Sequence, residues 1–386
     1  MQIKPVYLSS KSKTLHYQNK YKFDPNLFWQ GQYVFEIYGY SLSQHHILNS
    51  IYKKTSSLLT IHKHSELKSI LVHFFKRDWS NEELIDFLAQ DKEINAFFKQ
   101  VHEFFSDINK PIWNLRGNRL NFNKSPFIMG ILNVTPDSFS DGGKFSDINE
   151  AVDHALSMIE AGADIIDIGG ESTRPGSDPV NLQQELNRVI PVLETIRKHS
   201  GAPLSIDTYK SEVAEAAIKA GANIVNDISG CTFDKRMPEI IQTNDVPIII
   251  MHIKGTPKHM QSNPHYDDVC LEVYSFLSDQ INYLSNTGIK NIAVDPGIGF
   301  GKRLEDNLKL LNNLESLKFL CQPILIGASR KSFLGHVLDK EVDQRLYGSL
   351  SVAILSAIKG ADIIRVHDVA ETKDVLRIID AIHSAE

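Results

Sequence analysis

The sequence predicts an α/β protein in which a (β/α)8 TIM barrel follows a smaller mixed or mostly helical N-terminal region. Two observations predict the barrel. From residue 127 onward, eight short strand-like runs alternate with amphipathic helical patterns. Three helix-to-strand junctions also resemble one another, with a Gly at the helix end, then Asp or Asn, then an apolar run: EAGADIIDIGG, KAGANIVNDIS and IKGADIIRVHD. A doubly wound open sheet is the alternative, but the chain has neither a GxGxxG motif nor a switch-point signature.

The eight barrel strands are near-continuous runs of Ile, Val and Leu, as expected when helices cover a parallel sheet. In chain order they are FIMGILNV from residue 127, DIIDIGG from 164, PLSID from 203, NIVNDIS from 223, PIIIMHI from 247, NIAVDPG from 291, PILIGAS from 323 and DIIRVHD from 362. The segments between them have apolar residues at i, i+3, i+4 and i+7. This spacing predicts helices that bury one face on the sheet.

Residues 1–110 have a different pattern, and we expect an N-terminal region of unknown, non-catalytic role before a barrel that covers 111–386. The stretch QYVFEIYGYSLS predicts a strand, and residues 45–75 predict a mixture of helix and strand. The stretch SNEELIDFLAQDKEINAFFKQVHEFF predicts a helix that opens with a capping box, Ser80 to Glu83. Its apolar stripe consists of Leu84, Phe87, Leu88, Ile94, Phe97, Phe98 and Val101.

Composition argues against several functional classes. The net charge is −6 and no run of Lys and Arg is present, so we expect no nucleic-acid binding. No apolar run reaches the ~18 residues that a membrane span needs, and the N-terminus lacks the apolar segment of a signal peptide. We therefore expect no membrane partner and a cytoplasmic location. The three cysteines and the seven histidines before residue 110 lack the spacing of metal ligands.

Each predicted barrel strand ends in polar residues, and barrels of this kind build their active sites at the carboxyl ends of the strands. These residues are Asn133; Glu171, Ser172, Thr173 and Arg174; Asp207; Asn226 and Asp227; His252 and Lys254; Asp295; Ser329, Arg330 and Lys331; and Arg365, His367 and Asp368. Any single Asp, Asn or Ser could simply cap the next helix. A charge beside a buried strand is costly unless it is paired, so Asp207, Asp295 and Arg365 are stronger candidates.

The candidate cations form one chemical set. Arg174, Lys331, Arg365 and His367, together with the polar turn after ILNV, suit an anionic group with several oxygens. Arginine donates hydrogen bonds in pairs, and the N–H groups of a loop add further donors.

The candidate acceptors form a second set. Asp207, Asn226 and Asp295 suit a flat heterocycle rich in N–H donors. The nearby segment DPGIGFGK is not a Walker A phosphate loop, because Pro296 stands where that motif needs Gly and Arg303 where it needs Ser or Thr.

The motifs along the barrel resemble those of the dihydropteroate synthase family, in the family's order and from about Trp113 to Ile382. They are MGILNVTPDSFSDGG, GADIIDIGGESTRPG, SIDT, NDISG, MHIKGTP, DPGIGFGK, GASRKSFLG and RVHDV. The chain departs slightly at Lys254, where the family more often has Gln or Arg. The resemblance implies a transferase of folate biosynthesis that is a sulfonamide target. Its reaction condenses (7,8-dihydropterin-6-yl)methyl diphosphate with 4-aminobenzoate to give 7,8-dihydropteroate and pyrophosphate.

The resemblance also implies a role for individual residues, a Mg²⁺ cofactor, small-molecule substrates and a homodimer. The pterin-binding positions are Asp207, Asn226, Met251, Asp295, Phe300, Gly327 and Lys331. The diphosphate-binding positions are Asn133, Thr173, Arg365 and His367, with Asn133 also the metal contact. The aminobenzoate and mobile-loop positions are Phe139, Thr173, Arg174, Pro175, Lys331 and Ser332.

The polar stretch VTPDSFSDGG is expected to be a lid that wraps the diphosphate, with Phe139 covering the aminobenzoate ring. Two other functions remain open. A methyltetrahydrofolate-dependent methyltransferase on a related barrel would share the Asp and Asn pterin readers but would not need SRK or RVHD. A non-catalytic pterin-binding scaffold would need no intact motifs. Residues 1–110 are short for a fused pyrophosphokinase and lack a paired-Asp Mg²⁺ motif.

Overall fold

A computed structural model defines the fold and divides the chain into two compact units. It describes the chain except for residues 9–15, 18–19, 22–32, 55–58, 65–68, 75–87, 106–110, 116, 124, 135–143, 175 and 386. One unit contains residues 1–109 and 313–321, and the other contains residues 110–312 and 322–386. The capping box expected at Ser80 and the lid residues 135–143 therefore lie outside the described residues.

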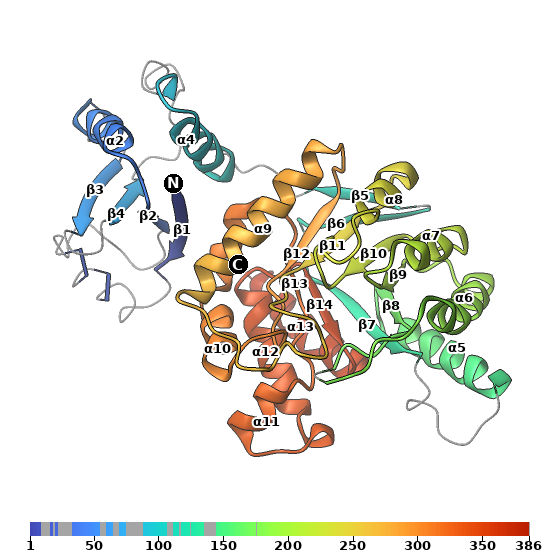
Figure 1. The fold of residues 1–386 in the computed structure, drawn as a ribbon. Helices are drawn as coiled ribbons and strands as arrows, with labels where there is room; N and C mark the ends of the chain where they lie inside the picture. The colour runs from blue at the N-terminus through green and yellow to red at the C-terminus, as the bar shows by residue number, and fades with distance from the viewer. Residues whose placement is uncertain are drawn as a thin grey trace. The chain divides into compact units, whose positions relative to one another are not determined.

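The larger unit is the predicted parallel barrel (Figure 1). Its strands are β7 (Phe127–Asn133), β8 (Ile165–Gly169), β9 (Leu204–Asp207), β10 (Ile224–Asp227), β11 (Ile248–Met251), β12 (Ile292–Asp295), β13 (Leu325–Ile326) and β14 (Ile363–Val366). The first strand, β7, pairs with both β8 and the last strand, β14. A parallel bridge between Val294 and Ile324 joins β12 to the segment of β13 and closes the ring. The prediction of a (β/α)8 barrel is confirmed.

Helices follow the strands and cover the outside of the barrel (Figure 1). They are α5 (Lys144–Glu160), α6 (Leu182–His199), α7 (Ser211–Lys219), α8 (Met237–Asn244), α9 (Val269–Asn286), α10 (Leu304–Asn312), α11 (Ser332–Leu338), α12 (Leu346–Ile358) and α13 (Val369–His383). Side-chain N-caps mark the start of some of these helices. At the start of α9, for example, the Asp268 side chain accepts hydrogen bonds from the amides of Cys270 and Leu271. Among the residues described, no helix is both long enough and apolar enough to cross a bilayer.

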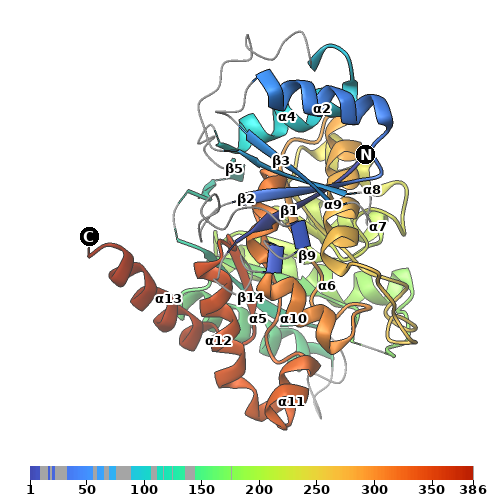
Figure 2. The same ribbon diagram turned by 90° about the vertical axis from the view of Figure 1, so that its left-hand side faces the viewer.

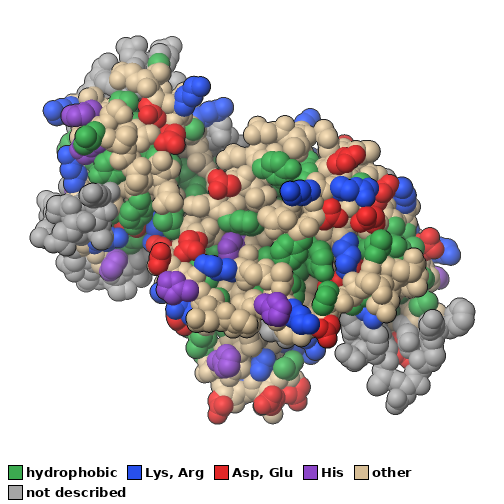
Figure 3. All heavy atoms as spheres, viewed as in Figure 1, with side chains coloured by type: hydrophobic (Ala, Val, Ile, Leu, Met, Phe, Trp, Pro, Cys, Tyr) green, Lys and Arg blue, Asp and Glu red, His purple; other side chains and the backbone are tan. Residues whose placement is uncertain are grey.

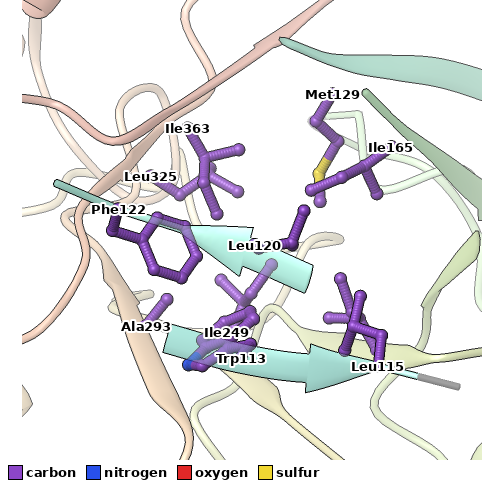
Figure 4. Packing of buried hydrophobic residues seen from close by; sticks show 11 residues of the cluster. Trp113, Leu115, Leu120, Phe122, Met129, Ile165, Ile249, Ala293, Leu325 and Ile363 are labelled. Atoms are coloured by element: carbon purple, nitrogen blue, oxygen red, sulfur yellow. The ribbon is translucent and has the colours of Figure 1, made fainter. Parts of the chain in front are cut away.

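A short hairpin plugs the amino-terminal end of the barrel (Figure 4). Its strands are β5 (Ile112–Leu115) and β6 (Asn118–Asn121). Trp113 is fully buried and meets Phe122 edge to face, with ring centroids 4.9 Å apart. These rings pack on the first inward-facing residues of the strands, such as Met129 and Ile363. The apolar plug leaves the opposite, carboxyl end of the barrel for polar side chains.

The smaller unit is an antiparallel sheet with helices, so the N-terminal region is of the mixed kind. Its strands are β1 (Gln2–Tyr7), β2 (Tyr33–Tyr38), β3 (Leu59–His64) and β4 (Ser69–Phe74), in the order β1-β2-β4-β3. Figure 2 shows α2 (Leu42–Lys54) and α4 (Lys92–Phe105) lying over this sheet. Helix α4 begins after Asp91, which accepts hydrogen bonds from the amides of Glu93 and Ile94. The described members of the apolar stripe are buried as expected: Leu88, Ile94, Phe97, Phe98 and Val101.

The smaller unit also includes a segment from the middle of the barrel sequence. This segment is the 3₁₀ helix η4 (Leu314–Leu320), between α10 and β13. The fully buried Phe319 ring packs on Phe35 of β2 and on Phe104 of α4, with centroids 4.7 and 5.4 Å apart. Tyr33 Oη donates to the Glu315 carbonyl at 3.2 Å. Residues 1–109 therefore share their hydrophobic core with a helix that the sequence reasoning had counted within the barrel.

Candidate active site

The inward-facing residues at the carboxyl ends of the strands form a polar ring. They are Asn133 on β7, Asp207 on β9, Asn226 on β10, Asp295 on β12 and Arg365 on β14, with the apolar Met251 of β11 beside them. The strand register sets them side by side, since Gly169 of β8 pairs with both Asn133 and Asp207. In the same way Asp207 pairs with Asn226, and Met251 with Asp295. The structure thus brings together residues that the sequence assigns to both chemical sets.

Arg365 links two acidic residues inside the barrel. Its Nε donates to Asp167 Oδ2 at 2.6 Å, and its Nη2 donates to Asp207 Oδ2 at 2.7 Å. Asp167 lies in the middle of β8 and is fully buried. Sequence reasoning missed Asp167, although it stands in the apolar run DIIDIGG two residues before the inward-facing Gly169. The strand period of two was the signal that could have identified it.

Asn226 shares the same buried carboxylate. Its Nδ2 donates to Asp167 Oδ2 at 3.0 Å, while its Oδ1 makes no hydrogen bond to any residue that the structure describes. The orientation of the Asn226 amide is therefore fixed by Asp167, and its carbonyl oxygen is free to accept from a ligand.

The neighbouring Asp207 has a perturbed pKa. Burial raises the pKa of Asp207, the Arg365 guanidinium lowers it, and the Asp167 carboxylate raises it further.

Asp295 presents a second carboxylate to the barrel mouth. Its Oδ1 accepts from the Gly297 amide at 2.7 Å, and its Oδ2 makes no hydrogen bond within the described part of the chain. Burial raises the pKa of Asp295, and the Lys331 ammonium opposes that rise. At Gly327 a side chain would point at this group, because a Cβ there would lie 4.0 Å from Asp295 Oδ2 and 3.7 Å from Arg365 Cδ.

Lys331 lies over the loop that follows β12. Its Nζ donates to the Ile298 carbonyl and is 4.5 Å from the centroid of the Phe300 ring. Burial lowers the pKa of Lys331 to about 8, although the Asp295 carboxylate raises it. The group is therefore still mostly protonated at neutral pH. Ser332, one residue further on, is exposed at the first position of α11.

Burial favours the neutral form of His367. Burial lowers its pKa to about 4, and the guanidinium groups of Arg365 and Arg330 lower it further. Its Nδ1 lies 3.0 Å from Ser329 Oγ. If the hydroxyl donates to Nδ1, Nε2 carries the proton and can donate to an anion. His367 therefore offers a hydrogen bond here, whereas the sequence reasoning grouped it with the cations.

The loop after β8 is held at its root by an ion cluster. Tyr209 Oη donates to Glu171 Oε1 at 2.8 Å, and Lys210 Nζ donates to both Glu171 and Glu185. Beyond this root, Thr173 is half-buried and Arg174 is exposed. Pro175 and Phe139, the other expected aminobenzoate positions, lie outside the described residues.

Some polar strand ends serve the fold. Asp227 accepts from the amides of Ser229 and Cys231 at 2.7 and 2.9 Å, and so holds the turn after β10. The buried His252 accepts at Nδ1 from Lys302 at 3.0 Å, and burial lowers its pKa to about 2. Gly297, with φ of +69°, is required beside it, since a Cβ there would lie 2.0 Å from the His252 carbonyl oxygen. For these residues the capping and packing interpretation is sufficient.

No group of three or more His, Cys, Asp or Glu side chains suited to a metal occurs among the residues that the structure describes. Charged side chains of both signs are interspersed over the face shown in Figure 3, with no continuous basic stripe among its described residues.

Comparison with known proteins places this site in a wider group. A family model described as "Pterin binding enzyme" matches residues 129–367. A dihydropteroate synthase of Synechocystis sp. is 45% identical over 262 residues, which are 67% of this chain and 91% of that protein.

Solved structures of dihydropteroate synthases are also similar to this chain. The dihydropteroate synthase of Yersinia pestis, solved with a sulfonamide drug, is 42% identical with a TM-score of 0.67, covering 71% of this chain and 100% of that one. The dihydropteroate synthase of Xanthomonas albilineans in complex with 7,8-dihydropteroate is 39% identical with a TM-score of 0.65, covering 72% and 100%. The range matched by the family model contains every candidate residue of the polar ring.

Proposed function

The chain belongs to the dihydropteroate synthase family of pterin-binding enzymes, and from that premise we propose how its own residues divide the work of the reaction. The enzyme is a transferase of folate biosynthesis. It condenses (7,8-dihydropterin-6-yl)methyl diphosphate with 4-aminobenzoate and releases 7,8-dihydropteroate and pyrophosphate. The observation that carries the assignment of roles is the polar ring, in which free acceptors face inward beside an arginine.

We assign pterin binding to Asp207, Asn226, Asp295 and Lys331. Met251 and Phe300 would form apolar walls of this part of the site, and Gly327, which has no side chain, would leave space for the ligand. A pterin presents an amino group and ring N–H groups along one edge, and these donors need acceptors. The Oδ2 of Asp295 and the Oδ1 of Asn226 supply acceptors that no described residue uses. The protonated Lys331 can donate to a ring oxygen or nitrogen.

The diphosphate-binding half consists of Asn133, Thr173, Arg365 and His367. Arg365 has a terminal nitrogen, Nη1, that makes no hydrogen bond to a described residue, and His367 can donate through Nε2. We further propose that 4-aminobenzoate binds beside Lys331 and Ser332, near Arg174, Pro175 and Phe139. This pocket is supported by the position of Ser332 immediately after Lys331 at the start of α11.

Asn133 fits the metal that the family implies. Mg²⁺ commonly takes one or two protein oxygens and completes its coordination with water and substrate phosphates. Asn133, on the inner face at the end of β7, can supply one such oxygen beside the residues assigned to the diphosphate, so we propose it as the protein ligand. The bound ion would supply positive charge against the departing pyrophosphate.

The chemistry is a substitution at the methylene carbon of the pterin. The C–O bond to the diphosphate breaks, and its electron pair leaves with the pyrophosphate oxygen. The electron-rich dihydropterin delocalises the positive charge left on the methylene. The aniline nitrogen then forms the C–N bond and releases a proton to water. Arg365 stabilises the charge that develops on the leaving group. Because the aniline nitrogen attacks a cationic methylene, the step requires no strong base from the protein.

Neither alternative function is favoured. A methyltetrahydrofolate-dependent methyltransferase would not need Arg365 and His367 together at the barrel mouth, and a non-catalytic pterin-binding scaffold would not need the diphosphate-binding residues. The relatives named above are dihydropteroate synthases.

We propose a homodimer formed by α12 and α13, which pack against each other and expose aliphatic side chains, namely Leu355, Ile358, Ile378 and Ile382. A second copy of the same face would bury them. Light scattering of wild type and Ile378→Asp tests this. We further propose that residues 1–110 have no catalytic role and that the protein is cytoplasmic; cell fractionation tests the location.

Purified enzyme incubated with the pterin diphosphate, 4-aminobenzoate and Mg²⁺ tests the function. We expect one pyrophosphate released for each 7,8-dihydropteroate formed, and little release without 4-aminobenzoate. Arg365→Ala is the matched control with strongly reduced activity. Pyrophosphate release without pteroate, equal in both proteins, would contradict the proposal.

A further inference from the structure

We propose that Asp167 is a positioning residue that holds Arg365 by Nε while Nη2 of the guanidinium moves from Asp207 to the diphosphate of the substrate. The proposal rests on the roles assigned above to Arg365 and Asp207. It adds a residue that contacts neither substrate and acts through two residues that do.

The hydrogen bonds of Arg365 separate a permanent contact from an exchangeable one. Nε donates to Asp167, whose side chain is 0% exposed, and Nη2 donates to Asp207, whose side chain is 11% exposed. A ligand that enters the barrel mouth can reach Asp207 and replace Nη2 there with its own N–H donors. It cannot replace Nε at a carboxylate that no solvent reaches.

The charge of Asp167 keeps the inner contact in place. Its Oδ1 is buried without a hydrogen-bond partner among the described residues, so Arg365 and the Asn226 amide alone compensate the carboxylate. Breaking the Nε contact would leave a buried charge unpaired, which is strongly unfavourable. Turning the guanidinium about this contact keeps the pair intact and aims Nη1 and Nη2 at the diphosphate.

The same carboxylate fixes the pterin side of the site. Because Asp167 Oδ2 accepts from Asn226 Nδ2, the Asn226 carbonyl oxygen must point toward the ligand. One buried oxygen thus orients a group from each half of the site. When the diphosphate draws Nη2 away, Asp207 becomes free for the pterin, so binding of the two halves of the substrate is linked.

A double-mutant cycle tests the inference. Asp167→Asn keeps the shape but removes the charge, and we expect kcat to fall about 10- to 100-fold because a charge-assisted hydrogen bond is lost. In an Arg365→Ala background the same change should lower kcat less than about threefold, since its effect passes through the missing arginine. The proposal would be overturned if Asp167→Asn lowered kcat by the same factor in the wild type and in the Arg365→Ala background.

Ser205→Ala is the matched control. Ser205 pairs with Asp167 in the strand register, is fully buried, and has an Oγ without a partner among the described residues. The Ser205→Ala substitution deletes a polar atom from the same layer of the barrel interior without changing a contact of Arg365. We expect its kcat to equal that of the wild type; a loss as large as that of Asp167→Asn would mean that the layer is merely sensitive to change.

Arg365→Lys keeps the test decisive if Asp167→Asn does not fold. Lysine retains the charge but has no Nε that can hold Asp167 while other nitrogens reach outward. We expect it to lose as much kcat as Arg365→Ala, and near wild-type activity would refute the inference. If Arg365→Ala itself leaves kcat unchanged, the diphosphate role in the proposed function fails instead. If Arg365→Ala is impaired but Asp167→Asn is not, only the inference about Asp167 fails.

Discussion

Asp295→Ala removes the acceptor that we assign to the amino and ring N–H donors of the pterin. Asp295 is 6% exposed, and its Oδ2 is unused by the described residues, so in the complex it would accept from buried donors. A hydrogen bond to a charged group contributes about 1.5–3 kcal/mol, and donors left unpaired on burial add to the loss. For two donors that share one carboxylate we expect a loss of about 2–4 kcal/mol, or about 30- to 1,000-fold in Kd.

Calorimetric titration with a pterin that lacks the diphosphate measures this loss directly. Asp295→Asn is the matched variant, since it keeps an acceptor for the Gly297 amide but loses the charge; its affinity should fall between those of Asp295→Ala and the wild type. Removing the charge should also lower the pKa of Lys331 further below about 8, because the Asp295 carboxylate raises that pKa. The titrations should therefore be made at about pH 6, so that Lys331 stays protonated in the wild type and in both variants. Pterin affinity within about threefold of wild type in Asp295→Ala would refute the assigned role.

Four other outcomes are expected. Asn133→Ala should spare binding of the bare pterin but lower kcat and weaken its response to a Mg²⁺ series; lost pterin affinity with a normal Mg²⁺ response would contradict this. Phe319→Ala should destabilise the smaller unit by about 3–5 kcal/mol in urea unfolding, because the ring is fully buried against Phe35 and Phe104; an unchanged unfolding curve would show that η4 does not support that unit. His252→Gln should make the free energy of unfolding less dependent on pH below about 6.5. The pKa of His252 in the folded protein is about 2, so only the unfolded chain takes up this proton as the pH falls. The wild type therefore loses stability at low pH, and the variant should lose less. Equal slopes in wild type and variant would contradict it. A sulfonamide should compete with 4-aminobenzoate in steady-state kinetics, and purely non-competitive inhibition would place the aniline pocket elsewhere.

The sequence was sufficient for the barrel and for most of the polar ring. Short, near-continuous apolar runs, separated by amphipathic helices, allow few other folds. Barrels of this kind build their active sites at the carboxyl ends of the strands, so the predicted strand ends alone identify Asp207, Asn226, Asp295 and Arg365 as candidates. These inferences succeed because they depend on local periodicity and on the cost of burying a charge.

Pairing within the ring was decided only by the tertiary structure. Arg365 lies 198 residues from Asp167 and 158 from Asp207 along the chain, and no spacing rule joins such positions. Sequence reasoning placed Arg365 and Asp207 in separate chemical sets and overlooked Asp167, since a buried Asp within a strand resembles an interruption of the apolar run. His367 was grouped with the cations because a one-dimensional pattern does not show the burial that lowers its pKa.

The composition of the smaller unit was likewise decided in three dimensions. Local patterns identified β2 and the stripe on α4, because each depends on residues a few positions apart. The contribution of η4 depends on contacts such as that of Phe319 with Phe35, which are separated by most of the chain. Sequence by itself determined which residues face inward and which are apolar, since periodicity and solvation act locally. Which of them touch depended on the closure of the barrel and on packing, because these fix the distances between remote segments.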